Sequence, residues 1–82
     1  MFGSFFKSRI RKDLEKLEET REKCVAVMRA KGVSETEIGN IDELSYQKAM
    51  GLYTESPDAS EAITVYCESL ISEAADRGYD IR

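Results

Sequence analysis

IRKDLEKLEETREKCVAVM, residues 10–28, is the stretch that decides the fold. Apolar residues recur in it at intervals of four and three, with Arg21 at the one position that breaks the series. Such a repeat keeps one face of an α-helix apolar, and that face must be buried against other helices. The stretch therefore predicts a long amphipathic helix in a bundle. The apolar positions are Ile10, Leu14, Leu17, Cys24 and Met28.

The composition is typical of a small helical protein. The chain has 82 residues, of which 41% are hydrophobic and 34% are charged, and this is too apolar for a disordered chain. A single proline and scattered β-branched residues disfavour strands. A chain of this length forms one helical domain, residues 1–82. We expect an all-α fold, a small up-down-up three-helix bundle with a long N-terminal helix.

The turn after the first helix carries the most specific local signal. Gly32 can take the left-handed conformation that ends a helix. Ser34 and Glu37 have the spacing of a capping box, and Val33 and Ile38 have the spacing of a hydrophobic staple. So short a turn predicts that the first and second helices are antiparallel neighbours.

The second helix is expected over residues 35–53. Its apolar residues spread widely around the helix, so it can contact neighbours on two sides. Gly39 and Gly51 weaken a helix interior. Gly39 could allow close packing, and Gly51 could mark an early end or a kink.

The third helix is expected after the sequence Ser56-Pro57-Asp58. Ser56 would serve as the N-cap and Pro57 would take the first helical position, where its missing N–H has no cost. Gly78 ends this helix as Gly32 ends the first. Residues 79–82 form a short tail, which is loose unless Ile81 docks.

The N-terminal arm, residues 1–10, carries the clearest functional signal. The first helix should begin near Ser4 or fray from Met1, and it is about 10 Å longer than the others at 1.5 Å per residue. The other two helices then cover it only to about residue 11, and an uncovered apolar stripe marks an interface. We predict that the arm, together with residues 11 and 12 that follow it in the same helix, binds a partner. The residues of this site are Phe2, Phe5, Phe6, Ile10, Lys7, Arg9, Arg11 and Lys12.

Two other interpretations of the arm stay open. The first residues could be irregular and fold back over the open end of the bundle as a hydrophobic plug. Alternatively, basic residues interleaved with phenylalanine suit an anionic membrane surface, although about ten residues with four cations make a weak anchor.

Charge is distributed unevenly along the chain. Residues 1–12 carry four cations and no acid, and residues 13–32 carry five of each sign. Residues 33–82 carry eleven acids and three cations, so the whole chain has a net charge of −4. A basic arm on an acidic body disfavours direct binding of nucleic acid. The acidic body could instead act as a decoy that occludes a nucleic-acid-binding protein.

Arg21 and the two cysteines have several possible roles. The Arg21 head could reach solvent while its stem packs, pair with Glu68 or Glu73 of the third helix, or fix the register of a dimer. Cys24 and Cys67 are expected to be free thiols that pack as small hydrophobic groups, with a disulfide as the alternative. Without histidine or a CxxC pair, no metal site or cofactor is expected.

Enzyme classes lack the residues they would need. There is no histidine for a Ser/His/Asp or Cys/His arrangement and no glycine-rich phosphate loop, so we expect no enzyme. We expect a small protein-interaction module: an adaptor, regulator or inhibitor that docks on a protein partner or forms a homodimer. The absence of a long apolar segment and of a disulfide framework indicates a cytoplasmic protein.

Overall fold

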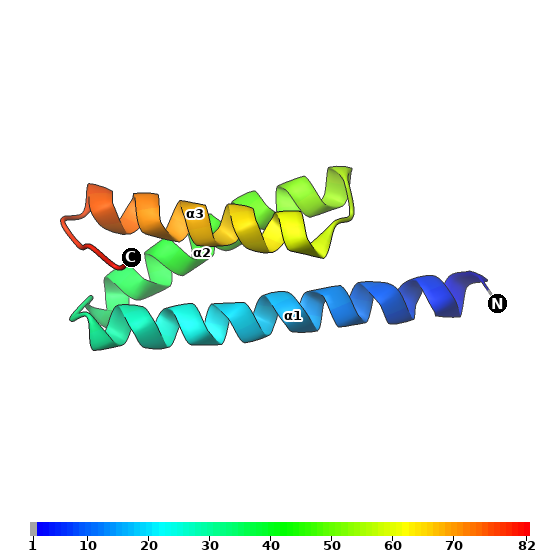
Figure 1. Ribbon diagram of the computed structural model, residues 1–82, viewed down its shortest axis with the longest axis horizontal. Helices are drawn as coiled ribbons and strands as arrows, with labels where there is room; N and C mark the ends of the chain where they lie inside the picture. Colours follow the sequence, from blue (N-terminus) through cyan, green and yellow to red (C-terminus); the bar gives the residue numbers. More distant parts are fainter. Residues whose placement is uncertain (1) are drawn as a thin grey trace.

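Three helices run up, down and up, which confirms the all-α bundle expected from the sequence. They are α1 (Phe2–Ala30), α2 (Glu35–Glu55) and α3 (Ala59–Asp76). The computed structural model describes the backbone of residues 2–82 and the side chains of residues 8–82 (Figure 1). Within this part of the chain no strand is present. The helices α1 and α3 run in the same direction, and α2 runs antiparallel to both of them.

The core lies where the three helices meet. Fully buried side chains include Met28 of α1, Ile41 of α2, and Tyr66 and Leu70 of α3. The backbones of α2 and α3 approach each other over more of their length than either approaches α1. Two serines explain this close approach, because small side chains let helix axes come near and Ser45 donates a hydrogen bond to Ser69 (3.0 Å).

The first corner has the predicted glycine end and N-cap, but only one of the two hydrogen bonds of the predicted capping box is found among the described residues. Gly32 has φ of 86°, and the Val33 N–H donates to the Met28 carbonyl (3.1 Å), which satisfies the end of α1. At the start of α2, the Ser34 hydroxyl accepts a hydrogen bond from the Glu37 N–H (3.3 Å). The two residues of the predicted staple are both buried: Val33 and Ile38.

The second corner differs from the prediction. The helix α2 continues through Gly51 to Glu55, and Gly39 has no neighbouring helix within contact of where a Cβ would lie. Ser56 was expected to cap α3, but its N–H instead closes the end of α2 on the Leu52 carbonyl. Asp58 is the N-cap of α3, because its carboxylate accepts from the Glu61 N–H (3.2 Å).

The end of the chain folds back on the bundle. Gly78 has φ of 88°, and the Tyr79 N–H donates to the Ala74 carbonyl (2.9 Å), which ends α3 as predicted. Tyr79 and Ile81 then pack against the core. The tail of residues 79–82 is therefore docked, and it lies beside α3 on its way towards α1 (Figure 1).

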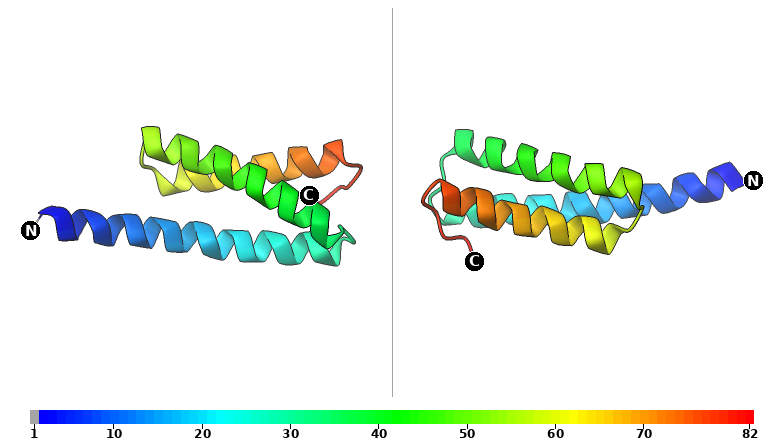
Figure 2. Two further views of the ribbon diagram at one scale, coloured as in Figure 1. Left: turned by 180° about the vertical axis from the view of Figure 1, so that it is seen from behind. Right: turned by 90° about the horizontal axis from the view of Figure 1, so that it is seen from above.

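The first helix begins at Phe2, between the two predicted starts at Met1 and near Ser4. The backbone of the arm is thus a continuation of α1, and the alternative in which it folds back as a plug disagrees with this geometry. Figure 2 shows the first turns of α1 extending past the corner between α2 and α3 in two views. Met1 and the side chains of residues 2–7 lie outside the described part of the structure.

Candidate functional site

The N-terminal arm continues beyond the other helices. α1 has 29 residues and α2 has 21, and they meet at the first corner, so α1 is longer by about 12 Å at 1.5 Å per residue. The other two helices lie beside α1 only as far as Arg9 and Ile10. These two residues line a hollow with Tyr53 and Pro57 at the second corner. The sequence placed this boundary near residue 11, within two residues of its position in the structure.

The predicted partner-binding residues fall into two groups. The side chains of Phe2, Phe5, Phe6 and Lys7 lie outside the described residues. Of the others, Ile10 is half-buried on its own chain, whereas the remaining three are exposed and form no ion pair with any described side chain. These three are Arg9, Arg11 and Lys12.

Several exposed charges of α1 group by sign around the helix, a pattern that summing charge along the chain does not reveal. At about 100° per residue, four cations fall within an arc of about 60°, and four glutamates fall within the adjacent arc of about 100°, which also holds the cation Arg11. We call these the basic flank and the acidic flank. The basic flank is Arg9, Lys12, Lys16 and Lys23, and the acidic flank is Glu15, Glu18, Glu19 and Glu22.

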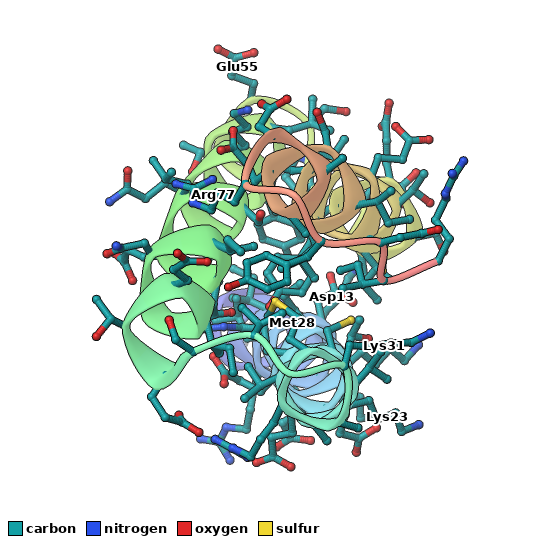
Figure 3. The ribbon with its side chains drawn as sticks, turned by 90° about the vertical axis from the view of Figure 1, so that its left-hand side faces the viewer. Asp13, Lys23, Met28, Lys31, Glu55 and Arg77 are labelled. Atoms are coloured by element: carbon teal, nitrogen blue, oxygen red, sulfur yellow. The ribbon has the colours of Figure 1, made fainter. Side chains whose placement is uncertain are left out.

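A hollow of about 250 Å³ lies between about one turn of α1, one turn of α3 and Ile81 of the tail. Its lining is mainly apolar, and Val27 at its edge is 44% exposed. Figure 3, a view along the bundle, shows Lys23 projecting from α1 on the side away from α2, with Met28 pointing into the core. We call this space the α1–α3 hollow. Its lining residues are Lys23, Cys24, Val27, Cys67, Leu70, Ile71 and Ile81.

Both cysteines line the α1–α3 hollow as free thiols. Burial raises the pKa of the Cys24 thiol to about 11, and the neighbouring Cys67 raises it further in the same direction. Cys24 is therefore protonated near neutral pH and a poor nucleophile, as expected for a thiol that packs against apolar groups.

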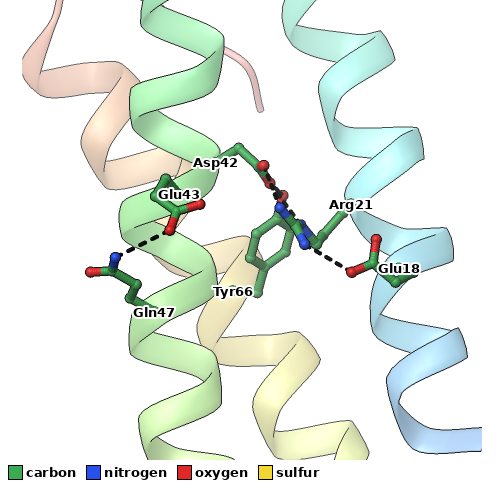
Figure 4. A network of polar contacts seen from close by, with 6 residues as sticks. All are labelled: Glu18, Arg21, Asp42, Glu43, Gln47 and Tyr66. Atoms are coloured by element: carbon green, nitrogen blue, oxygen red, sulfur yellow. Dashed lines mark hydrogen bonds and ion pairs between the residues drawn. The ribbon is translucent and has the colours of Figure 1, made fainter. Parts of the chain in front are cut away.

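One polar network joins all three helices (Figure 4). Asp42 of α2 accepts two hydrogen bonds from Arg21 of α1, Nε to Oδ1 at 3.1 Å and Nη2 to Oδ2 at 2.8 Å, and a third from the Tyr66 hydroxyl of α3. Arg21 also pairs with Glu18 (2.8 Å) and lies 4.0 Å from the centre of the Tyr46 ring. The predicted partners of Arg21, Glu68 and Glu73, were wrong, because the acid that faces it comes from α2.

The pKa values of this network follow from its contacts. Burial alone would raise the pKa of Asp42, but the hydrogen bonds from Arg21 and Tyr66 outweigh it and hold that pKa below its ordinary value. Burial and then Asp42 raise the pKa of Tyr66, and the hydrogen bond to Asp42 raises that of Arg21. Both oxygens of Asp42 are thus occupied by its own chain, and the network connects helices instead of presenting a reactive group.

The described residues hold neither a metal-binding cluster nor a membrane-spanning helix. No group of three or more histidine, cysteine, aspartate or glutamate side chains there is arranged to hold a metal ion. In the same part of the chain, no helix combines the length and the apolar character needed to cross a bilayer.

Comparison of the chain with protein-family models, with curated protein sequences and with solved structures finds no match.

Proposed function

We propose that the protein is a small helical protein-interaction module, an adaptor, regulator or inhibitor that docks its N-terminal arm on a protein partner. The observation that carries this proposal is the helical backbone of α1, which continues from the bundle to Phe2 with no other helix beside it (Figures 1 and 2). The sequence places three phenylalanines in this short stretch. An aromatic helical segment of this kind fits a hydrophobic groove on another protein.

Charge favours a foreign partner over an arm-to-arm homodimer. Residues 1–12, which are the arm and the two residues that follow it, carry four cations and no acid. Two arms packed side by side would bring eight like charges to one seam, which opposes association. A partner with acidic residues around an apolar groove would instead be steered by these cations and anchored by the phenylalanines.

The proposal is tested by changing the phenylalanines in the full chain. Proteins retained from a lysate by the immobilised chain are compared with those retained by the double variant Phe5→Ser, Phe6→Ser. The matched control is Leu44→Ser, which changes an exposed apolar residue of α2 that is 41% accessible. We expect a partner, identified by mass spectrometry and then purified, to bind the wild type and the control at least about tenfold more tightly than the double variant.

Two outcomes would contradict the proposal. If the double variant binds the same partner with unchanged affinity, the arm is not the docking element. If light scattering instead shows that the wild type is a dimer and the double variant is a monomer, the phenylalanines form a homodimer interface. Circular dichroism of each variant controls for loss of folding.

A further inference from the structure

The only two cysteines of the chain lie far apart in the sequence but line the same hollow. We propose that Cys24 of α1 and Cys67 of α3 form a reversible disulfide when a small disulfide such as oxidised glutathione reaches the α1–α3 hollow. The pair is then a redox-sensitive device that sets how firmly α1 is held on the bundle. This inference does not depend on docking of the N-terminal arm, and its test needs no partner.

The polar network around Asp42 holds the two cysteines at the same height of the bundle. Arg21 of α1 donates two hydrogen bonds to Asp42 (3.1 and 2.8 Å), and the Tyr66 hydroxyl of α3 donates a third (Figure 4). Cys24 lies about one helical turn after Arg21, and Cys67 follows Tyr66 directly. The network therefore places the Cys24 level of α1 opposite the Cys67 level of α3.

The two thiols are neighbours within the hollow. Cys67 raises the pKa of Cys24 partly through its charge and partly through a hydrogen bond between the two side chains. A hydrogen bond acts only at short range, so the sulfur atoms lie next to each other. Because a disulfide forms only between residues that are already close, this pair on facing helices is suited to form one.

The hollow gives a small oxidant access to the pair. Cys24 and Cys67 are both partly exposed, whereas Met28, Tyr66 and Leu70 beside them are fully buried. Burial raises the pKa of Cys24 to about 11, so only a small fraction of this thiol is thiolate near neutral pH. Exchange is therefore slow, and the pair responds to a lasting change in the redox conditions.

The chemistry is two successive thiol–disulfide exchanges. In the first, the thiolate of one cysteine attacks a sulfur atom of oxidised glutathione, a mixed disulfide forms, and one glutathione thiolate leaves. In the second, the thiolate of the other cysteine attacks the protein sulfur atom of the mixed disulfide, and the second glutathione leaves. The two cysteines together lose two electrons and two protons, and oxidised glutathione takes them up to give two molecules of glutathione.

The disulfide acts where the bundle has the fewest contacts. The backbones of α2 and α3 approach each other over more of their length than either approaches α1. In the reduced form, α1 is held by noncovalent contacts and the first corner. In the oxidised form, a covalent bond also joins it to α3 and closes a long loop, which restricts the unfolded chain. The oxidised protein should therefore be more stable, and α1 should open less often.

The experiment equilibrates the full chain with mixtures of reduced and oxidised glutathione at about pH 8.5, where more of each thiol is ionised. Mass spectrometry of the alkylated chain measures the product. We expect the loss of two hydrogen atoms and a cross-link between the peptides of Cys24 and Cys67. The equilibrium constant for closing the disulfide should be at least about tenfold larger in the folded chain than in urea. By linkage, oxidation should raise the thermal midpoint by at least about 5 °C.

A displaced thiol is the matched control. The variant Cys67→Ser, Glu68→Cys keeps two cysteines and nearly the same loop, but its second thiol is at an exposed position about 100° further around α3. Its closing constant should equal that of the wild type in urea and be at least about tenfold smaller than that of the wild type in the folded chain. Circular dichroism shows whether each variant is folded.

Four results would overturn the inference. Equal closing constants in the folded and the urea-unfolded wild type would show that the fold does not favour the bond. Equal constants for the wild type and the displaced thiol would show that the two positions are not special. A product that keeps glutathione on each cysteine, or that joins two chains, would mean that the thiols react separately. Equal amide hydrogen exchange of α1 in the reduced and oxidised forms would mean that the bond does not hold α1.

Discussion

The contact between α2 and α3 includes a pair of small buried side chains, whereas the described polar contacts of α1 with the other helices use long ones. Small groups meet between α2 and α3, where Ser45 and Ser69 lie close enough for a hydrogen bond. The α1 helix is joined to the others by long side chains, through the Arg21–Asp42 ion pair and the hydrogen bond from Tyr53 to Asp13. Small side chains bring helices close, whereas long ones hold them further apart. The wider spacing of α1 explains why the α1–α3 hollow lies beside it.

The largest effect is expected where α2 and α3 are closest. Ser45→Leu adds volume at a fully buried position and leaves the Ser69 hydroxyl without its partner. We expect it to lower the free energy of unfolding by about 3 kcal/mol. Leu17→Met, a volume-conserving change on α1, should cost less than about 1.5 kcal/mol. Urea unfolding measures both, and similar costs would remove the difference between the two contacts.

A smaller loss is expected when the polar network is broken. Asp42→Ala leaves the buried Tyr66 hydroxyl and the Arg21 guanidinium without their shared acceptor. We expect a cost of about 2 kcal/mol, because the Arg21 and Asp42 side chains are still 20% and 16% exposed and solvent screens the ion pair. Glu43→Ala on the same helix is the control and should have almost no effect. A cost no larger than that of the control would mean that the network does not hold α1.

Acid should weaken the same network less than Asp42→Ala does. The folded protein holds the pKa of Asp42 below its ordinary value, so this contribution is complete above the unfolded value of about 4 and is lost as pH falls through the folded value. The difference in unfolding free energy between wild type and Asp42→Asn should therefore be constant above about pH 5 and shrink below about pH 4. Urea unfolding at stepped pH measures it, and a difference that stays constant down to pH 2 would contradict this assignment.

The smallest effect is expected at the far end of α1. Tyr53→Phe removes only the hydroxyl that donates to Asp13 (2.7 Å) and keeps the buried ring. We expect a loss of about 1 kcal/mol in thermal or urea unfolding. A stability equal to that of wild type would show that this end of α1 is held by apolar contacts alone.

Local signals in the sequence predicted the local structure. The Ser34–Glu37 spacing and Gly32 located the first corner, because a cap depends on residues within one turn. The choice between Ser56 and Asp58 was wrong because both can cap, and the end of α2 decides between them. Long-range features were harder to predict.

The partner of Arg21 depends on how α2 is rotated about its axis. The broad apolar arc of α2 does not define that rotation, so the sequence did not predict that Asp42 pairs with Arg21. Ser45 was missed because a buried serine looks like a polar surface residue until its partner on the next helix is known. The basic flank did have a signal, the spacing of Arg9, Lys12, Lys16 and Lys23, but summing charge by segment concealed it.

The unbroken course of α1 has a consequence for insertions and deletions. Because the helix continues through the edge of the bundle, the number of residues between Ile10 and the phenylalanines sets the direction that they face. One residue inserted between Ser8 and Arg9 would turn the first turns of α1 by about 100° and move them about 1.5 Å outwards. Seven inserted residues would restore their direction to within about 20° while moving them about 10 Å outwards. Direction and reach of the arm can thus be varied separately, without any change to the core.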